Sequence, residues 1–207
     1  MPDILCFGDS NTHGSAPLAE LGVVRRYKRA RRWPWVMARA LGAGWHVIEE
    51  GHPGRTTVRD DPLVGEHRNG ARVLPSMLES HKPDLLVVML GTNDLKAQFA
   101  MTAQDVALGA GRLVDMAQGS GFVGQILLIA PVLVEERGCL AEMFTGAAAK
   151  SCAMGAHFAQ VAQMRGVAFL DAAEHVAPDP LDGVHLSAAS HEVLGLAVAA
   201  KLQEIVA

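Results

Sequence analysis

Short runs of apolar residues recur along the chain, separated by longer stretches with helical spacing. Five runs are the right length for buried strands and lack the alternation of half-exposed ones; they lie at 4–7, 45–48, 85–90, 126–130 and 167–170. Stretches of helical length and spacing lie between or after them, at 33–41, 71–81, 102–118, 139–164 and 187–206. The pattern therefore predicts strands that alternate with helices along the whole chain.

Strands that alternate with helices need right-handed crossovers, which produce a parallel sheet covered on both faces. We predict an α/β fold with three layers, α/β/α, around a flavodoxin-like sheet of five parallel strands, in one domain spanning 1–207. Three irregular stretches, at 15–32, 51–69 and 131–138, each follow a strand. Because the carboxyl ends of parallel strands share one edge of the sheet, these loops should meet there and build the functional site.

The composition fits a protein with a full hydrophobic core and no global attraction to polyanions. Half of the 207 residues are hydrophobic and the formal net charge is -4, so nucleic acid or an anionic membrane would need a local patch. Three cysteines cannot all pair, and free thiols in a reducing compartment are expected. The chain begins with Met-Pro-Asp and enters a strand without a signal-peptide pattern. We therefore expect a cytoplasmic protein.

A basic run at 25–32, Arg-Arg-Tyr-Lys-Arg-Ala-Arg-Arg, stands out from this acidic balance. We interpret it as a solvated arm or a contact between subunits. Attraction of anionic substrates is an alternative, and contact with nucleic acid is disfavoured because the run has one tyrosine and the whole chain is acidic. Trp33-Pro34-Trp35 follows, and exposed Trp and Arg side chains favour protein interfaces, so we expect a homo-oligomer.

The first strand runs directly into a turn that carries a candidate nucleophile. Gly-Asp-Ser-Asn at 8–11 consists of residues that favour turns and helix N-caps. Ser10 is thus predicted at the carboxyl edge of the sheet and at a helix N-terminus, where backbone N–H groups favour developing negative charge. Taken alone, the segment is explained at least as well by a simple turn with a capping residue.

Three later segments at strand ends carry further candidate groups. Gly54 follows the second strand and can point a backbone N–H at a ligand, although a plain loop glycine is the simpler explanation. Asn93 follows the third strand and offers a side-chain amide donor or a helix cap. After the fifth strand, Asp182 precedes His185 by three residues, so the carboxylate can fold back onto the imidazole while the second ring nitrogen faces Ser10.

Acyl transfer through a serine requires this set of residue types: a nucleophile, a base, a carboxylate that fixes the tautomer of the base, and donors for an oxyanion. The segments are Ile-Leu-Cys-Phe-Gly-Asp-Ser, Glu-Glu-Gly-x-x-x-Arg-Thr-Thr, Met-Leu-Gly-Thr-Asn-Asp-x-Lys and Asp-Gly-x-His. In this order they closely resemble the four blocks of the SGNH hydrolases, also called the GDSL family. They look most like its arylesterase branch, which is known for acyltransferase and perhydrolase activity.

The resemblance implies a role for each residue. Ser10 would be the nucleophile, His185 the base and Asp182 its orienting partner. The oxyanion hole would consist of the backbone N–H groups of Ser10 and Gly54 together with the side chain of Asn93. The implied activity is that of a serine esterase that hydrolyses short-chain aryl or alkyl esters through an acyl-enzyme and can also transfer the acyl group to alcohols or peroxide.

Two departures from the family pattern concern the substrate. Asn11 stands where the family name expects Leu, and should alter the turn and the wall behind the nucleophile. His52 and Pro53 reshape a loop that carries other side chains in relatives. We therefore predict that Asn11, His52 and Pro53 bind substrate.

Other interpretations use the same residues. A carbohydrate acetyl esterase, or a lysophospholipase or thioesterase of the same superfamily, is the main alternative. A non-catalytic protein of this fold would be expected to lack one of the triad residue types. We expect no cofactor and no metal, a small-molecule ester as substrate, and neither nucleic acid nor membrane as a partner. A metal-dependent hydrolase is disfavoured because its ligand set would have one histidine, in Asp9, Asn93, Asp94, Asp182 and His185.

Overall fold

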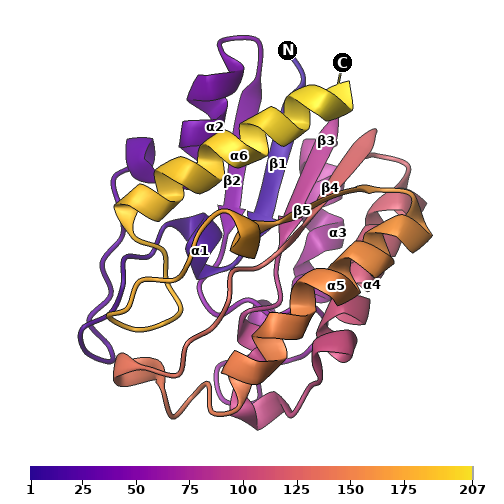
Figure 1. Cartoon of the computed structure of the whole chain (residues 1–207). Helices are drawn as coiled ribbons and strands as arrows, with labels where there is room; N and C mark the ends of the chain where they lie inside the picture. The colour runs from indigo at the N-terminus through magenta and orange to yellow at the C-terminus, as the bar shows by residue number, and fades with distance from the viewer. Residues whose placement is uncertain (207) are drawn as a thin grey trace.

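The computed structural model describes residues 1–206, and within them a sheet of five parallel strands has the order β2-β1-β3-β4-β5 (Figure 1). The strands are β1 (Asp3–Gly8), β2 (His46–Gly51), β3 (Leu85–Met89), β4 (Gln125–Ala130) and β5 (Ala168–Asp171). The helices are α1 (Ser10–His13), α2 (Trp33–Leu41), α3 (Gly70–His81), α4 (Ala103–Ser120), α5 (Ala147–Arg165) and α6 (Ala188–Val206). The predicted α/β fold with a five-stranded parallel sheet is confirmed.

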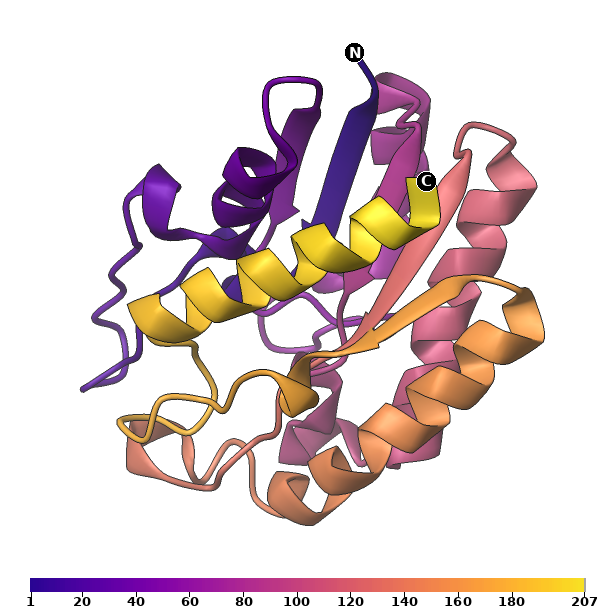
Figure 2. The ribbon, with the colours of Figure 1, turned by 45° about the horizontal axis from the view of Figure 1, so that its top comes forward.

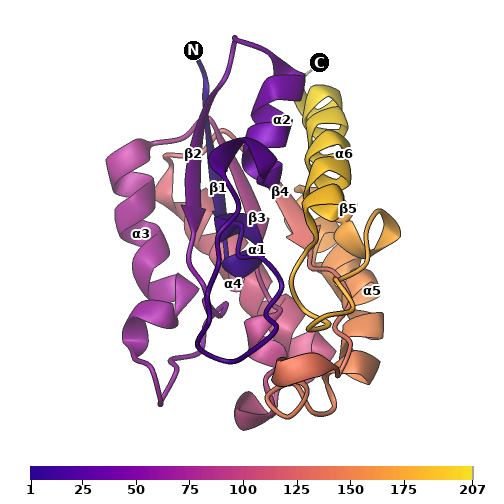
Figure 3. The same cartoon turned by 90° about the vertical axis from the view of Figure 1, so that its left-hand side faces the viewer.

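Helices cover both faces of the sheet, as the view in Figure 3 shows, with α3 to one side of the strands and α2 and α6 to the other. Ile4 and Cys6 of β1 enter the core beneath α2 and α6. Leu5 and Phe7, which alternate with them, enter the core beneath α3, α4 and α5. Because both faces are covered, all four side chains are fully buried, which explains an apolar run without alternation.

One predicted helix is wrong over its first eight residues. The spacing predicts a helix at 139–164, but α5 begins at Ala147, preceded by a 3₁₀ turn at Gly138–Leu140 and further turns. Gly146, with φ +79°, lies in the left-handed region directly before α5 and ends any helical continuation from the preceding turns. The segment from 138 to 146 is thus a loop at the end of the sheet.

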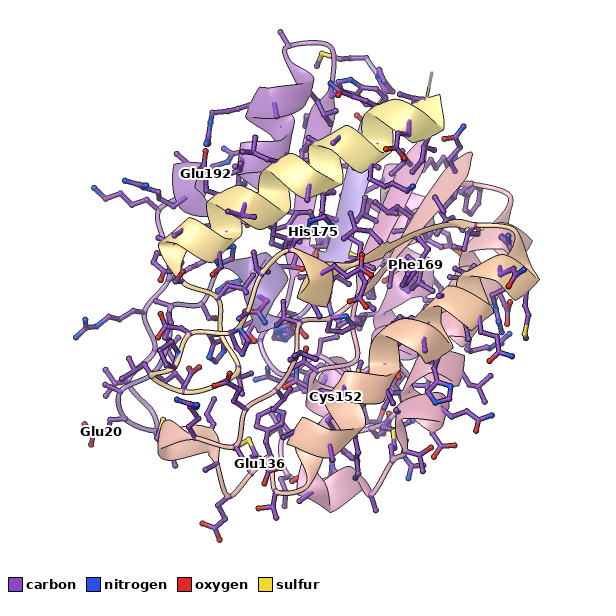
Figure 4. All side chains as sticks on the ribbon, in the orientation of Figure 1. Glu20, Glu136, Cys152, Phe169, His175 and Glu192 are labelled. Atoms are coloured by element: carbon purple, nitrogen blue, oxygen red, sulfur yellow. The ribbon has the colours of Figure 1, made fainter. Side chains whose placement is uncertain are left out.

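The loops that follow the strands gather at the carboxyl edge of the sheet, below the strands in Figures 1 and 2. Glu20, on the loop after α1, and Glu136, on the loop after β4, are labelled at this edge in Figure 4. The loop after α1 is anchored to edge strand β2, because Glu49 of β2 accepts hydrogen bonds from Arg26 (3.2 Å) and Arg32 (2.7 Å) of this loop. Within residues 1–206, no helix is long and apolar enough to cross a membrane.

Candidate active site

A pocket of about 140 Å³ lies at the carboxyl edge of the sheet. Ser10, Gly54, Asn93 and His185 all line it, although they are far apart in the sequence. Its wall is mainly apolar and comes from the loops after α1, β2 and β4. Side chains of this wall include Leu18, Val24, Leu140, Met143 and Phe144, with Lys96 as a charged neighbour.

Ser10 is the first residue of the one-turn helix α1, directly after β1. Asp9 is the N-cap of this helix, and its carboxylate accepts the backbone N–H of Asn11 (2.9 Å). The backbone N–H of Ser10 has no acceptor among residues 1–206. The turn thus presents a hydroxyl and a free backbone donor from the same residue to the pocket.

The Asp182 carboxylate holds His185 through both its backbone and its ring. Asp182 Oδ2 lies 2.6 Å from His185 Nδ1, while Asp182 Oδ1 accepts the backbone N–H groups of Val184 (3.0 Å) and His185 (2.9 Å). A further N–H, from Leu18, donates to Oδ2 (2.7 Å). Burial acts to raise the pKa of Asp182, but the hydrogen bonds and the imidazole outweigh it and lower the pKa to about 2.

An ionised carboxylate is only an acceptor, so it fixes the tautomer of the histidine. With Asp182 charged at neutral pH, Nδ1 of His185 carries the proton and donates it to Oδ2. Nε2 of the neutral ring is then left as an acceptor. The arrangement can therefore accept a proton at Nε2 and stabilise the imidazolium that results.

Two further donors come from the loop after β2 and the turn after β3. Gly54 has φ +79°, and no acceptor for its N–H occurs in the described part of the chain. Asn93 is buried, and its Nδ2 donates to the carbonyl of Arg55 (3.1 Å), which uses one of its two amide hydrogens. A second hydrogen remains for a ligand in the pocket. The backbone N–H groups and this amide can together stabilise an oxyanion.

Arg55 and Asp94 connect the segments that carry these donors to their neighbours. The sequence did not predict this supporting role for either residue. The Arg55 guanidinium donates to the carbonyls of Gly8 (3.0 Å) and Glu50 and lies over the ring of Phe7. The Asp94 carboxylate accepts the backbone N–H of Thr57 (3.0 Å) and its hydroxyl (2.6 Å). The only sequence signal was the presence of both residues in the quoted blocks, Arg-Thr-Thr and Thr-Asn-Asp.

The structure places the three predicted substrate contacts differently. Pro53 lines the pocket. His52 is not part of the pocket wall and packs beside His67, and burial with nearby arginines lowers its pKa to about 4. Asn11 is also not part of the wall. It is 2% exposed, and its amide group bonds the backbone of Val184 and Leu186. Of the three, the pocket wall therefore includes Pro53, and the substrate contacts of His52 and Asn11 stay predictions.

The residues of the metal-site alternative do not gather around one point. Among residues 1–206, no three His, Cys, Asp or Glu side chains come together in a group that could hold a metal ion. The carboxylates of Asp94 and Asp182 instead face Thr57 and His185.

Comparison with known proteins places this fold and site in a family. The model of the GDSL-like lipase/acylhydrolase family matches residues 6–193. The chain belongs to this family. A comparison with curated proteins found no match.

Two similar solved structures are esterases by name, and a third shares the fold. A carbohydrate acetylesterase from Sinorhizobium meliloti is 38% identical with a TM-score of 0.94, over 99% of this chain and 100% of that one. The native aryl esterase of M. smegmatis is 37% identical with a TM-score of 0.93, over 99% of both chains. The structure of TesA, 20% identical with a TM-score of 0.71 over 98% of this chain and 99% of its own, shares the fold. This GDSL-family protein is a carboxylic ester hydrolase.

Proposed function

We propose that the protein hydrolyses short-chain acyl esters through a covalent acyl-enzyme, with Ser10 as nucleophile, His185 as base and Asp182 as the residue that orients it. The observation that carries this proposal is the 2.6 Å contact between Asp182 and His185, because His185 lines the same pocket as Ser10. Gly54 and Asn93 complete it as oxyanion donors, with the free N–H of Ser10.

The reaction has two matching halves. The Ser10 hydroxyl attacks the ester carbonyl while its proton passes to Nε2 of His185, and the oxyanion is held by the N–H groups of Ser10 and Gly54 and the amide of Asn93. As the tetrahedral intermediate collapses, the imidazolium of His185 returns the proton to the departing alcohol. Water then enters, loses a proton to His185 and attacks the acyl carbon, and the second collapse restores the Ser10 hydroxyl.

The size and lining of the pocket support a short acyl group. A volume of about 140 Å³ is below the usual range for drug-sized ligands, about 300–1,000 Å³, and the wall is mainly apolar. The carbohydrate acetylesterase neighbour also supports a small acyl group, because acetyl is the group in its name. A carbohydrate acetyl esterase is the second candidate, favoured by the 38% identity to the Sinorhizobium meliloti enzyme of that name.

A chain-length series with a matched inactive variant tests the proposal. Turnover of p-nitrophenyl esters from acetyl to decanoyl, beside acetylated sugars, should be highest for the short acyl groups. A fluorophosphonate should add one label to the wild type and none to Ser10→Ala. Wild-type ester turnover in Ser10→Ala, or the absence of an adduct by intact mass, would contradict the assignment of the nucleophile. Faster release of acetate from acetylated sugars than from aryl acetates would favour the second candidate.

A further inference from the structure

We infer that Asn11 is a positioning residue that fixes the base to the helix of the nucleophile; this inference rests on the proposed roles of Ser10 and His185. Asn11 directly follows Ser10 in α1 and is buried. Its Nδ2 donates to the carbonyl of Val184 (3.1 Å), and its Oδ1 accepts the backbone N–H of Leu186 (3.0 Å). These two partners stand on either side of His185, so one carboxamide spans the base.

Together with two aspartates, Asn11 completes the backbone hydrogen bonding around His185. Asp182 accepts the N–H groups of Val184 and His185, and the N–H of Asp179 donates to the carbonyl of His185 (2.8 Å). Asn11 takes the two groups that remain, the carbonyl of Val184 and the N–H of Leu186. From the N–H of Val184 to that of Leu186, every backbone polar group therefore has a partner, so His185 cannot shift without breaking one of these bonds.

Asn11 differs from the aspartates because it belongs to the other half of the site. Asp179 and Asp182 lie in the same loop as His185, so they shape that loop without fixing its distance to the nucleophile. The N–H of Leu18 also reaches Asp182, but it lies eight residues after Ser10, in a loop. Asn11 is adjacent to Ser10, and its own backbone N–H is capped by Asp9. The direct connection between nucleophile and base thus passes through its side chain.

The chemistry of this connection requires a carboxamide. The partner groups are one acceptor and one donor, and a carboxamide offers one of each at the right separation. An aspartate side chain lacks the donor for Val184. Leucine, the residue in the family name, lacks both groups and leaves the buried carbonyl of Val184 and N–H of Leu186 unpaired. In this chain Asn11 is therefore the means by which α1 and the His185 loop are held in register.

Asn11→Leu is the decisive variant. We expect kcat for a short ester to fall on the order of 10- to 100-fold with KM little changed, because small displacements of a base from its nucleophile have effects of this size. Inactivation by a fluorophosphonate should slow by a similar factor, since it uses the same Ser10–His185 geometry.

Two comparisons separate positioning from simple loss of stability. Thr102→Ala removes the N-cap of α4 at a residue that does not line the pocket, and should lower the melting temperature without lowering kcat. In a His185→Ala background no base is left to position, so adding Asn11→Leu should change the residual rate little. If His185→Ala itself keeps wild-type turnover, the proposed function fails instead of this inference.

Unchanged kcat in Asn11→Leu would overturn the inference, as would an equal effect with and without His185. A loss of kcat in Thr102→Ala that matches its loss of stability would overturn it as well. If Asn11→Leu does not fold, Asn11→Asp keeps the size of the side chain and removes the donor to Val184. Its kcat should fall on the same substrate, and wild-type kcat in that variant would contradict the role of Asn11.

Discussion

Three buried aspartates lie in the segments that carry the candidate catalytic residues, and their hydrogen bonds give them different charge states. Burial raises the pKa of Asp9 to about 6 and that of Asp94 to about 7, because their hydrogen bonds compensate only part of the desolvation. The pKa of Asp182, in contrast, is lowered to about 2 by its bonds to His185 and to backbone N–H groups, despite burial. Asp182 is therefore the one of the three with a firmly held negative charge at neutral pH, and it is the one beside the imidazole.

Asn93→Ala should lower kcat and leave KM nearly unchanged. In the proposed role, the remaining amide hydrogen of Asn93 donates to an oxyanion that exists only in the transition state, and loss of one such donor costs roughly 2.7 to 4 kcal/mol. Steady-state kinetics on a p-nitrophenyl acetate series measures the split between kcat and KM. A change confined to KM would show that Asn93 binds the ground-state ester instead.

At the scale of single residues, the sequence indicates those whose role follows from their position after a strand. It does not indicate residues whose hydrogen-bond partners are far away in the chain. Ser10, Gly54, Asn93 and the Asp182–His185 pair each follow a predicted strand in the chain, so the topology predicts that they meet at one edge. Asn11 bonds residues that are 173 and 175 positions away. Nothing in a local pattern indicates such a partner, so a departure from the family name suggested a substrate contact.

Two elements on the same face of the sheet, α2 and α6, meet around a buried histidine. His191 of α6 is fully buried, and its Nδ1 accepts the backbone N–H of Trp33 (3.3 Å), the first residue of α2. Burial, followed by the charges of His185 and Arg32, lowers the pKa of His191 to about 4. A neutral imidazole therefore forms part of this helix contact.

His191→Asn should weaken the loss of stability on acidification. A folded-state pKa of about 4, below the ordinary value of 6.5, means that the unfolded chain binds the proton first as the pH falls. The stability that the buried, neutral His191 contributes is fully present above pH 6.5. It is lost as the pH falls through about 4, and it amounts to at most about 3 kcal/mol. Urea unfolding of both proteins at pH 7 and pH 4 measures the difference.

The comparison between the two proteins is needed because Asp9 and Asp94, with raised pKa values, act in the opposite direction over part of this range. Their contribution is common to wild type and variant and cancels in the difference. Equal pH dependence in both proteins would contradict the role assigned to His191.

Gly183→Ala should reduce both stability and turnover. Gly183 has φ +71°, and a Cβ there would collide with the carbonyl oxygen of Glu135, on the loop after β4. A non-glycine residue in such a conformation costs of order 1–3 kcal/mol, and relief of the collision would displace the adjacent Asp182 and His185. Gly119→Ala, in α4 with open space around it, is the matched control and should keep full activity. Equal kcat in the two variants would contradict the prediction.

Element boundaries show where periodicity fails as a guide. Leu140, Phe144 and Ala147 have helical spacing and are all buried, which predicts a helix from 139 onward. In the structure, Leu140 and Phe144 line the pocket from turns, and α5 begins only at Ala147. The helix-like spacing therefore came from side chains that build the pocket wall. Because that spacing was interpreted as a helix, the sequence did not indicate the wall.

The outer surface of the molecule bears on the proposed oligomer. Trp33 and Pro34 are buried in the core, which excludes them as exposed interface anchors, and Trp35 is half-buried beneath the guanidinium of Arg29. Some of the exposed apolar residues lie on helices, and others lie on the loops that follow α1 and the strands. The loop residues are the candidates for a contact near the pocket. They include Leu21, Val24, Met143 and Leu181, with Leu63 the most exposed at 81%. Exposed apolar side chains on these loops, here called the apolar rim, favour contact with another protein surface.

We expect the protein to form a homo-oligomer through this rim and to transfer acetyl groups to alcohols in competition with water. Burying the loops around the pocket would lengthen its apolar entrance and lower the access of water to the acyl-enzyme relative to an organic acceptor. Leu63→Glu should weaken the assembly and lower the ratio of transfer to hydrolysis. Met164→Glu, at an exposed position of α5 (65% exposed), is the matched control and should change neither. Light scattering measures the oligomeric state, and an assay with vinyl acetate and benzyl alcohol in buffer measures the ratio of transfer to hydrolysis.

A monomeric wild type that releases only acetic acid, or one that prefers decanoyl to acetyl esters, would contradict this prediction and leave the assignment of Ser10 unaffected.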